Sequence, residues 1–485
     1  MNIKLVSNYL GRIMALGGVC MIPALLIAVF KGEMQSMIAF SVAIILQAIL
    51  GLLILLTVKP QDKNMYAKEG FVIVVLSWVI ISFFGAVPMC LSGAIPSVID
   101  ALFETVSGFT TTGATILTEI ESLPMSVLYW RSFTHWLGGM GVLVLLLTLA
   151  PSKKGSGMSL HILRAESPGP TVGKFAPKLH FTARILYLIY IGLTVLELVF
   201  LLFGKMPFFD ALTTSFGTAG TGGFSIKNDS IASYSPYCQG VISVFMLLFG
   251  VNFGIYFLAL VGNVRDIWKN SELRLYLGVI AVSTFAVTIN VLGKFGSFRE
   301  SLHHSFFQVV SIMTTTGFST VDFNEWPEIS HTIILILMVI GACAGSTGGG
   351  FKVSRVIIVF KSMKSEIKRL IHPHSVTVPV IDGKPLEKST SDRCSAFMYV
   401  YVITIIASVL LLSFENYGFK TNFSAVLACL NNIGPGVEAV GPMENFAFFS
   451  PLSKIVLMLD MLLGRLELFP MLVIFMPSTW RKKGY

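Results

Sequence analysis

The sequence has few charged residues and few of the side chains that bind metals or form disulfides. Only 13% of its 485 residues are charged, which is about half the usual share of a soluble domain. Its six cysteines lie far apart, at Cys20, Cys90, Cys238, Cys343, Cys394 and Cys429. None belongs to a CxxC pair and no histidine lies near them at ligand spacing, so the pattern indicates neither a metal cluster nor a disulfide framework. No catalytic constellation is visible either, and we predict a protein that is not an enzyme and has no bound organic cofactor.

Apolar residues, by contrast, dominate the chain. Hydrophobic residues make up 54% of it and include 38 phenylalanines, and the mean hydropathy is +0.77. Several apolar runs are long enough to cross a bilayer as helices, which takes about 20 residues each. We therefore predict an all-α polytopic membrane protein.

The net charge of +9 could suggest nucleic-acid binding, but the positions of the basic residues argue against it. Most of the 35 Lys and Arg fall in connections that would lie on one side of the membrane, at 4, 59–68, 153–184, 265–274, 352–393 and 481–483. This distribution follows the positive-inside rule, which predicts that these segments and both termini are cytoplasmic. We expect contact with membrane lipid and none with nucleic acid.

A short pattern rich in threonine and glycine occurs four times. The copies are TTTGAT from Thr110, TAGTGGFS from Thr218, TTTGFST from Thr314 and NNIGPG from Asn431. They lie roughly 100 residues apart, each after a short amphipathic segment between long apolar runs, which indicates a fourfold internal repeat. A bare cation must exchange its hydration shell for other oxygens, and the carbonyls of an extended loop can supply them. Four such loops predict a pore, whereas the alternative is four tight turns without a shared role.

The repeat divides the chain into five parts. We predict an N-terminal transmembrane hairpin (1–69), a first pore repeat (70–150), a cytoplasmic loop with the second repeat (151–265), a third repeat with a broken second helix (266–370), and a cytoplasmic loop with the fourth repeat (371–485). Each repeat would contain a helix, a re-entrant pore helix too short to cross the bilayer, and a second helix. The expectation is ten spans and four re-entrant pore helices around a central pore. Each pore helix would point its negative C-terminal end at the ion path, which favours cations.

The motifs TTTGAT, TGGFS, TTTGFST, CLNNIG, GSTGGGFK and GRLELFP, in this order, resemble those of the Trk/Ktr/HKT superfamily of potassium transporters, in particular its bacterial TrkH/TrkG branch. The resemblance covers essentially the whole chain. It implies a K+ selectivity filter lined by the carbonyls of Thr111, Thr112, Gly113, Ala219, Gly220, Thr221, Gly222, Thr315, Thr316, Gly317, Asn432, Ile433 and Gly434. The second copy has two registers: the TAG tripeptide makes Gly220 the filter glycine, whereas the DAL tripeptides of copies one and two align Gly113 with Gly223, so Gly222 and Gly223 stay open.

The glycine-rich stretch GACAGSTGGGFK (341–352) interrupts an apolar run of the third repeat. It lacks the GK[ST] ending of a phosphate-binding loop, so nucleotide binding is not expected there. One interpretation is close helix packing through small residues, and the other is a break in the helix that enters the pore as a gate. The resemblance favours the gate, formed by Gly345, Ser346, Thr347, Gly348, Gly349 and Gly350.

Arg465 lies in an apolar run, where a charge is costly unless it faces water or a partner. It either forms a structural ion pair with Asp460 or Glu467, or has a functional role. The resemblance implies the second: the guanidinium would project below the filter, oppose unregulated cation flow and help to hold the gate. Arg131 and Glu197, also in apolar runs, are expected to form structural pairs.

Acidic residues follow every copy of the pattern and would make the outer vestibule negative. They are Glu119, Glu121, Asp229, Asp322, Glu325, Glu328, Glu438 and Glu444. His303 and His304, near the start of the third pore helix, are expected to be loop residues.

The resemblance implies uptake of potassium and rubidium across the bacterial inner membrane, and the membrane potential would drive it. The resemblance further implies a homodimer and a cytosolic TrkA-type nucleotide-binding ring that regulates opening. Two alternatives stay open. One is a proton- or sodium-coupled potassium symporter, for which Glu197, Asp460 and Glu467 are the candidate carboxylates, and the other is a nonconducting membrane scaffold.

Overall fold

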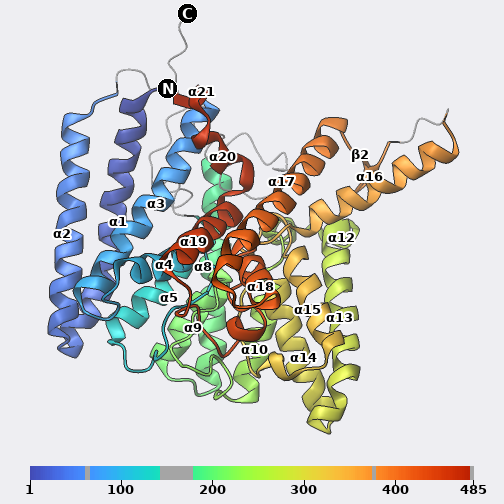
Figure 1. Cartoon of the computed structure of the whole chain (residues 1–485), viewed down its shortest axis with the longest axis horizontal. Helices are drawn as coiled ribbons and strands as arrows, with labels where there is room; N and C mark the ends of the chain where they lie inside the picture. The colour runs from blue at the N-terminus through green and yellow to red at the C-terminus, as the bar shows by residue number, and fades with distance from the viewer. Residues whose placement is uncertain (61–65, 142–178, 374–377, 481–485) are drawn as a thin grey trace, which may run out of the picture.

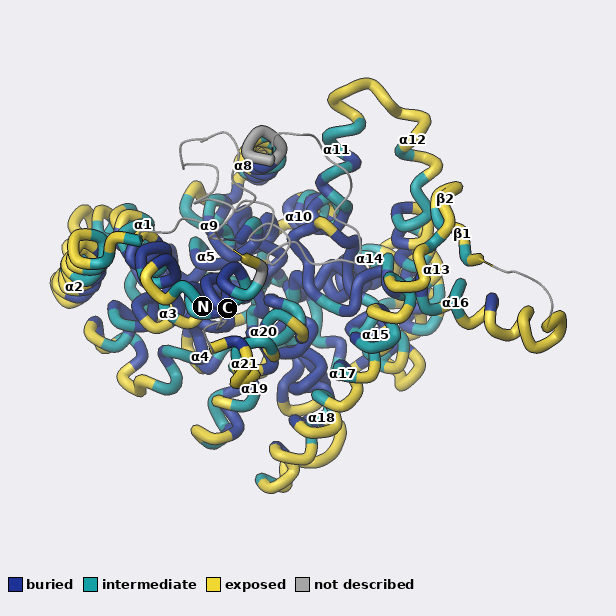
Figure 2. The backbone as a smooth tube through the Cα atoms, turned by 90° about the horizontal axis from the view of Figure 1, so that it is seen from above, coloured by how far each residue is buried: buried dark blue, intermediate teal, exposed yellow. Residues whose placement is uncertain are grey.

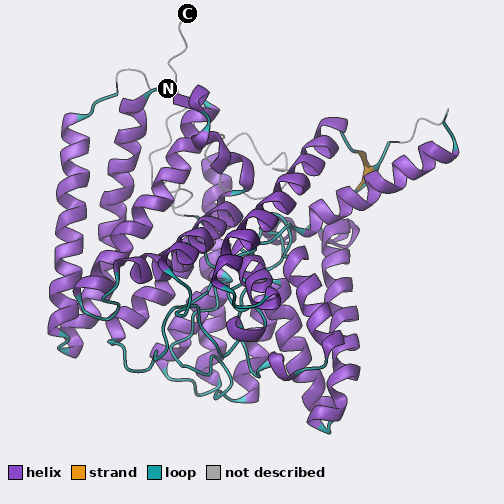
Figure 3. Cartoon of the chain, in the orientation of Figure 1, coloured by secondary structure: helices purple, strands orange, loops and turns teal. Residues whose placement is uncertain are grey.

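The protein is almost entirely helical (Figures 1 and 3). The computed structural model describes residues 1–60, 66–141, 179–373 and 378–480. The one sheet in these ranges pairs the short strands β1 (Val380–Ile381) and β2 (Lys384–Pro385). The helical fold confirms the predicted all-α class. The predicted end of the first repeat and most of the basic connection after it, 142–178, lie outside the described residues, as does the basic end 481–485.

Helices α1 (Ile3–Lys31) and α2 (Met34–Thr57) form a hairpin at one edge of the molecule (Figure 1). Asn2 caps the start of α1 by accepting a hydrogen bond from the N–H of Leu5. Gly32 follows the last residue of α1 in the left-handed conformation, with φ of 70°, which glycine adopts without strain and which turns the chain into α2. The predicted N-terminal hairpin has these two helices.

The rest of the described chain forms four groups of helices, and in each group one helix of 12 to 16 residues leads into a copy of the Thr/Gly pattern. In chain order they are α3 (Ala67–Leu91), α4 (Val98–Phe109) and α5 (Met125–Gly139); then α8 (Leu179–Phe203), α9 (Phe208–Gly220), α10 (Pro236–Phe249) and α11 (Phe253–Leu260); then α12 (Val264–Lys269), α13 (Ser271–Phe295), α14 (Phe298–Met313), η1 (Phe323–Glu325), α15 (Glu328–Ile340) and α16 (Val353–Ile371); and last α17 (Lys388–Leu412), η2 (Ser413–Glu415), α18 (Phe419–Leu430), η3 (Glu438–Val440), α19 (Pro451–Leu466), α20 (Leu468–Phe475) and α21 (Pro477–Trp480). The short helices α4, α9, α14 and α18 have 12, 13, 16 and 12 residues. They are too short to cross a bilayer, which takes about 20 residues.

Six helices in the described ranges are long and apolar enough to span a membrane, namely α1, α2, α3, α8, α13 and α17. Helices α10 and α11 pass the same test only as a pair, and they are bent by 88°. The apolar helices make this a multi-pass membrane protein. The count of ten spans stays a prediction, because it treats each interrupted helix pair as one crossing.

The second long helix of a group is interrupted in three of the four groups. Between α10 and α11, the side chain of Asn252 accepts a hydrogen bond from Gly254 N at 2.8 Å and starts a new helix. Between α15 and α16 the chain leaves helical geometry from Gly341, with φ of 70°, to Lys352, with φ of 75°. Between α19 and α20 the break falls at Glu467, with φ of 64°. The sequence predicted only the break in the third group.

The short helices gather at the centre of the molecule. Viewed from above, the backbone around α4, α9, α14 and α18 is mostly buried, while α2 and the outer end of α16 carry many exposed residues (Figure 2). The start of α1 and the last helix, α21, lie at the same end of the molecule as the β1–β2 hairpin and the outer end of α16 (Figure 1). Three of the Thr/Gly copies follow the C-terminal ends of α4, α14 and α18, and the second copy begins within the last turn of α9.

Candidate ion-conducting site

Each short helix leads into a turn with the same backbone conformation. Positive φ angles of 56°, 52°, 60° and 54° occur at Thr111, Thr221, Thr315 and Asn432. Two residues further on, angles of 82°, 80°, 85° and 96° occur at Gly113, Gly223, Gly317 and Gly434. We call residues 110–113, 220–223, 314–317 and 431–434 the ring segments. Their shared conformation is the structural counterpart of the fourfold pattern in the sequence.

This geometry distinguishes the two registers of the second copy. Gly223 has the conformation of Gly113, whereas Ala219 and Gly220 lie in the last turn of α9. The register that aligns TAG with the other copies is therefore corrected to the one that aligns the DAL tripeptides. In this register the equivalent residues are Thr111 and Thr221, and Thr112 and Gly222.

The four ring segments pack against one another in a closed order. A Cβ atom added to each ring glycine would meet a carbonyl oxygen of the next segment, at 2.0 Å for Gly113 and Gly222, 2.0 Å for Gly223 and Thr316, 2.1 Å for Gly317 and Ile433, and 2.8 Å for Gly434 and Thr112. Contacts below 3.0 Å are essentially absent for real Cβ atoms. Only glycine therefore permits this approach, which brings carbonyl groups of all four segments into one ring.

Side chains hold the ring segments in place. The hydroxyls of Thr110 and Thr112 lie 2.8 Å apart, and those of Thr314 and Thr316 lie 2.8 Å apart. Asn432 Nδ2 donates a hydrogen bond to Thr112 Oγ1 at 2.9 Å. The hydroxyls of these threonines are engaged within the protein, so the backbone carbonyls are the oxygens best suited to replace the water around a cation.

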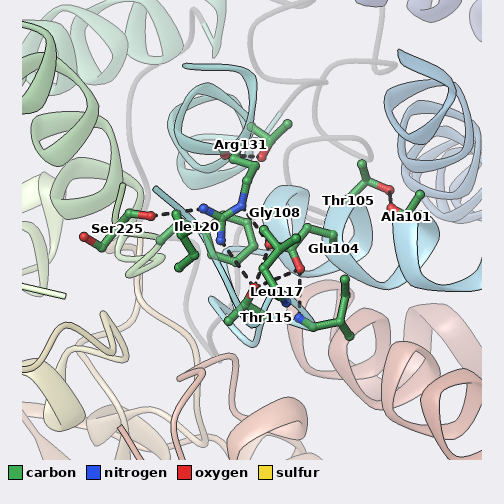
Figure 4. Close-up of polar contacts among 12 residues, drawn as sticks. Ala101, Glu104, Thr105, Gly108, Thr115, Leu117, Ile120, Arg131 and Ser225 are labelled. Atoms are coloured by element: carbon green, nitrogen blue, oxygen red, sulfur yellow. Dashed lines mark hydrogen bonds and ion pairs between the residues drawn. The ribbon is translucent and has the colours of Figure 1, made fainter. Parts of the chain in front are cut away.

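A buried ion pair supports the first two ring segments (Figure 4). Arg131 Nε of α5 lies 2.8 Å from Glu104 Oε1 of α4. The Glu104 carboxylate also accepts hydrogen bonds from Thr115 Oγ1 at 3.0 Å and from Ile116 N at 3.1 Å. Arg131 in turn donates to the carbonyl of Ser225 at 3.0 Å. The pair thus joins the chain just after the first ring segment to the chain just after the second, and the predicted pairing of Arg131 is confirmed.

His135 makes a second link between the same segments. Its Nδ1 lies 2.8 Å from the carbonyl oxygen of Gly108 in α4, and its Nε2 accepts a hydrogen bond from Phe224 N at 3.1 Å. A backbone N–H can only donate, so Nε2 has no hydrogen and Nδ1 donates to Gly108. A neutral imidazole in one defined tautomer therefore joins the first short helix to Phe224, the residue that follows the second ring segment.

Sequence reasoning missed Glu104 and His135 as site residues. Both lie on segments that were expected to be helical, and neither belongs to a motif. The available signal was the position of each relative to Arg131. Glu104 is one of two acids of the short helix before Arg131, and His135 lies one turn after Arg131 on the same helix.

A cavity of about 110 Å³ opens on one side of the ring. All four ring glycines line it, together with Glu444 and Lys227. The cavity borders the loops that follow the ring segments, where the sequence predicts an outer vestibule. Its polar lining suits a hydrated cation that approaches the ring.

Several of the predicted vestibule acids are paired with lysines. Lys294 Nζ lies 2.5 Å from Glu325, and Lys420 Nζ lies 3.3 Å from Glu328 and 3.6 Å from Glu438. The hydrogen bond from Lys294 lowers the pKa of Glu325, and the hydrogen bond to Glu328 raises the pKa of Lys420. These pairs offset part of the negative charge that the sequence predicts there.

The glycine loop (341–352) lies against the opposite side of the ring from this cavity. Gly349 N donates a hydrogen bond to Thr315 Oγ1 at 2.6 Å. A Cβ atom added to Gly349 would lie 2.3 Å from the carbonyl oxygen of Asn431. The loop backbone therefore approaches two ring segments more closely than a side chain would allow. The predicted gate residues 345–350 all belong to this loop.

The loop is also anchored to the break between α10 and α11. Cys343 N donates to the carbonyl of Gly250 at 3.1 Å, and Phe253 N donates to the carbonyl of Gly345 at 3.0 Å. The loop is not helical between α15 and α16, so the interpretation as a small-residue packing surface on a continuous helix is excluded.

Arg465, in the last turn of α19, connects three parts of this site. Its Nη1 donates to Thr111 Oγ1 at 3.1 Å and to the carbonyl of Thr347 at 2.8 Å. Its Nη2 donates to the carbonyls of Gly138 at 2.5 Å and Gly139 at 2.7 Å. The guanidinium thus joins the first ring segment, the glycine loop and the end of α5.

The acids considered as ion-pair partners of Arg465 have other contacts. Asp460 Oδ1 accepts a hydrogen bond from Ser408 Oγ at 2.8 Å. Glu467 forms an ion pair with Arg355.

Two further predictions about polar side chains differ from the structure. Glu197 is fully buried in α8, and its oxygens have no hydrogen-bond partner among the described residues, so the expected pairing is not found there. The nearby Thr218 hydroxyl donates to the carbonyl of Thr214 at 3.0 Å. His303 and His304 are helical residues of α14 rather than loop residues, because the helix starts five residues earlier than His303, at Phe298.

The chain is similar over its whole length to proteins of known class. Residues 33–482 match the family model described as "TrkH: Cation transport protein". The Trk system potassium uptake protein TrkH of Salmonella typhimurium (strain LT2) is 35% identical over 492 residues, covering 99% of this chain and 100% of that protein. The Trk system potassium uptake protein TrkG of Escherichia coli (strain K12) is 33% identical over 491 residues, covering 99% of each. The crystal structure of the potassium transporter TrkH from Vibrio parahaemolyticus matches with a TM-score of 0.89 and 31% identity, covering 99% of this chain and 100% of that one.

The helical membrane fold, with four related segments meeting in a ring of backbone carbonyls, defines a cation-transport protein rather than an enzyme. More particularly, the chain belongs to the TrkH family of cation transport proteins. The predicted family is confirmed.

Proposed function

We propose that the protein takes up potassium, and rubidium as its close analogue, through the ring segments. The observation that carries this proposal is the contact of each ring glycine with a carbonyl of the next segment, which supports a site where four peptide chains surround one dehydrated cation. The names of the relatives, which are potassium uptake proteins, support potassium as the ion. The filter would consist of Thr111, Thr112, Gly113, Thr221, Gly222, Gly223, Thr315, Thr316, Gly317, Asn432, Ile433 and Gly434.

The glycine loop would act as the gate beneath this filter. Its hydrogen bond from Gly349 to Thr315 and its contact with Asn431 support a closed arrangement, in which an ion leaving the filter meets the loop backbone. Arg465 would add a positive charge at the same level and, through its hydrogen bonds to Thr111 and Thr347, resist displacement of the loop. Opening would require these bonds to exchange partners.

The membrane potential would drive uptake, since it is worth about 2.3 kcal/mol per elementary charge per 100 mV. The proposed orientation in the bacterial inner membrane has both termini in the cytoplasm. It is supported by the distribution of Lys and Arg along the chain and by the common position of α1, α16 and α21 at one end of the molecule (Figure 1). With each interrupted helix pair counted as one crossing, the arrangement would have ten spans and four pore helices.

On the basis of the family resemblance we further propose a homodimer that binds a cytosolic TrkA-type nucleotide-binding ring. At the proposed cytoplasmic end, α16 presents exposed basic residues, including Lys364, Lys368 and Arg369, which suit contact with an acidic protein surface. The proposed division into a hairpin and four pore repeats keeps the boundaries at 69, 150, 265 and 370.

Flux through the purified protein in liposomes tests the proposal. With potassium, rubidium and sodium gradients imposed separately, we expect current to reverse near the potassium equilibrium potential and to stay there when a pH gradient or a sodium gradient is added. A reversal potential that moves with the proton or sodium gradient would instead support the coupled symporter. Absence of flux under every gradient would support the nonconducting scaffold.

A further inference from the structure

The first turn of α13 holds both ends of the glycine loop. Glu272, the second residue of α13, accepts a hydrogen bond from Ala344 N at 2.6 Å and another from Ser354 N at 3.2 Å, both through the same carboxylate oxygen. Ala344 lies near the start of the loop, and Ser354 lies in the first turn of α16 just after the loop ends. One side chain therefore joins the two ends of the loop to a third helix.

The chemistry of this contact suits a carboxylate. The N–H groups at the start of a helix have no partner within the helix and carry partial positive charge, so an acidic side chain stabilises them. Ser354 N is such a group at the start of α16. Glu272 is half-buried, which strengthens a charge-assisted hydrogen bond relative to one in water.

The residue before Glu272 connects the same turn to a surface element. Ser271 N donates to Asp382 Oδ1 at 2.8 Å, and Asp382 lies in the turn of the β1–β2 hairpin. Lys361 of α16 donates to the carbonyl of Val380 in β1 at 2.5 Å. The exposed hairpin is thus bound both to the first turn of α13 and to the helix that follows the glycine loop.

We propose that Glu272 is a positioning residue that holds the glycine loop closed from the end of α13, and that the β1–β2 hairpin transmits its own movement to the loop through this turn. The proposal rests on the proposed function in one respect, which is that the glycine loop is the gate. Displacement of the hairpin pulls on Ser271, shifts the adjacent Glu272, and releases the N–H groups of Ala344 and Ser354 together.

The chain contains a reporter for this test. Cys343 is a free, buried thiol within the loop, directly before Ala344. Cys429 is a free, buried thiol in α18, away from the contacts of Glu272. The rate at which N-ethylmaleimide modifies each cysteine is measured by mass spectrometry over a range of pH. Because the charge of Glu272 acts directly on the Cys343 thiol, the rate constants of the fully ionised thiols are compared, and these report whether the loop alone has loosened.

The experiment compares full-length wild-type protein in liposomes with Glu272→Ala, Glu272→Gln and Asp382→Asn. Glu366→Gln is the matched control, since Glu366 is an exposed carboxylate of α16 that pairs with Arg369 at 2.9 Å. We expect Glu272→Ala to raise the modification rate of Cys343 by about tenfold, as for the loss of a charge-assisted hydrogen bond. Glu272→Gln and Asp382→Asn are expected to give smaller increases, and the control none. Potassium flux rises in the same order, while the ratio of potassium to sodium flux stays constant because the ring segments are untouched.

An unchanged Cys343 rate in a folded Glu272→Ala variant would overturn the proposal, and so would equal acceleration at Cys343 and Cys429, which indicates general loosening. An unchanged rate in Asp382→Asn would overturn the part assigned to the hairpin. If Glu272→Ala does not fold, Glu272→Gln is judged by the same criteria. The modification rates do not depend on ion flux, so a wild-type protein that fails to carry potassium would refute the proposed function and leave this test intact.

Discussion

Asn432 donates a hydrogen bond to the hydroxyl of Thr112 at 2.9 Å, although 320 residues separate them in the sequence. The two residues belong to the last and the first ring segments, so this bond closes the ring. The same amide nitrogen donates to the carbonyl of Met461 in α19 at 2.9 Å. The asparagine that replaces a threonine of the other copies therefore fixes the contact between the two ends of the repeat.

Asn432→Ala is expected to lower the ratio of potassium to sodium flux several-fold. The alanine removes both hydrogen bonds, so the first and fourth ring segments can separate. A ring that is held less firmly discriminates less between potassium and sodium. Flux in liposomes measures the ratio. Asn416→Ala is the control, because Asn416 has a similar positive φ of 59° but is exposed at the end of η2. An equal effect of both variants would assign the loss to backbone strain.

Gly223→Ala is expected to abolish selective potassium flux. The new Cβ would lie 2.0 Å from the carbonyl oxygen of Thr316, and the φ of 80° is itself unfavourable for alanine. Gly113→Ala should have the same effect, since its Cβ would lie 2.0 Å from the carbonyl oxygen of Gly222. Gly278→Ala in α13, where no atom lies within 4 Å of the added Cβ, should keep wild-type flux. Normal selectivity in Gly223→Ala would contradict the ring.

Arg465→Gln is expected to raise potassium flux about tenfold, which corresponds to a barrier lower by about 1.4 kcal/mol. The substitution removes the positive charge below the ring and the bonds to Thr111 and Thr347. Arg465→Lys keeps the positive charge but loses the planar pair of N–H donors. Its potassium flux should therefore lie between that of the wild type and that of Arg465→Gln. Arg369→Gln, an exposed position of α16, serves as control. A decrease in flux with Arg465→Gln would contradict a role in restraining the gate.

The ion pair of Glu104 and Arg131 is expected to contribute to stability in a way that a double-mutant cycle reveals. Removal of one partner leaves the other buried and unpaired, which costs about 3–5 kcal/mol. Glu104→Gln and Arg131→Gln should each lower the unfolding temperature in detergent strongly. The double variant should be destabilised less than the sum of the two, by about 1–3 kcal/mol of coupling. Additive losses would mean that the two side chains do not act as a pair.

The protein should lose stability as the pH falls below about 6.5, the usual pKa of histidine. Burial lowers the pKa of His303, helped by the charge of Arg299, and burial also lowers the pKa of His304. As the pH falls, these histidines therefore bind protons in the unfolded chain at a higher pH than in the folded protein. The stabilising contribution of the neutral histidines is complete above about pH 6.5 and is lost as the pH falls towards their folded-state pKa values. Thermal unfolding of the wild type against His303→Gln/His304→Gln measures this. Identical pH profiles would contradict it.

The sequence predicted the helical class, the position of the ring segments and the broken helix of the third repeat because each depends on local composition. It did not determine the register of the second copy, since Ala219 and Gly220 resemble ring residues until the end of α9 is known. The break at Asn252 was missed because it has neither a glycine run nor a proline. The break at Glu467 was missed although Pro470 lies in the first turn of α20, where proline is favoured. The contacts of Arg465 and His135 join residues that are distant in sequence, so only the fold reveals them.

Diffraction from crystals soaked in rubidium tests the central claim most directly, because rubidium scatters anomalously and substitutes for potassium. We expect an anomalous peak inside the ring, surrounded by the carbonyl oxygens of Thr112, Gly222, Thr316 and Ile433. A well-ordered ring without a peak, or with the ion bound only elsewhere in the molecule, would contradict it.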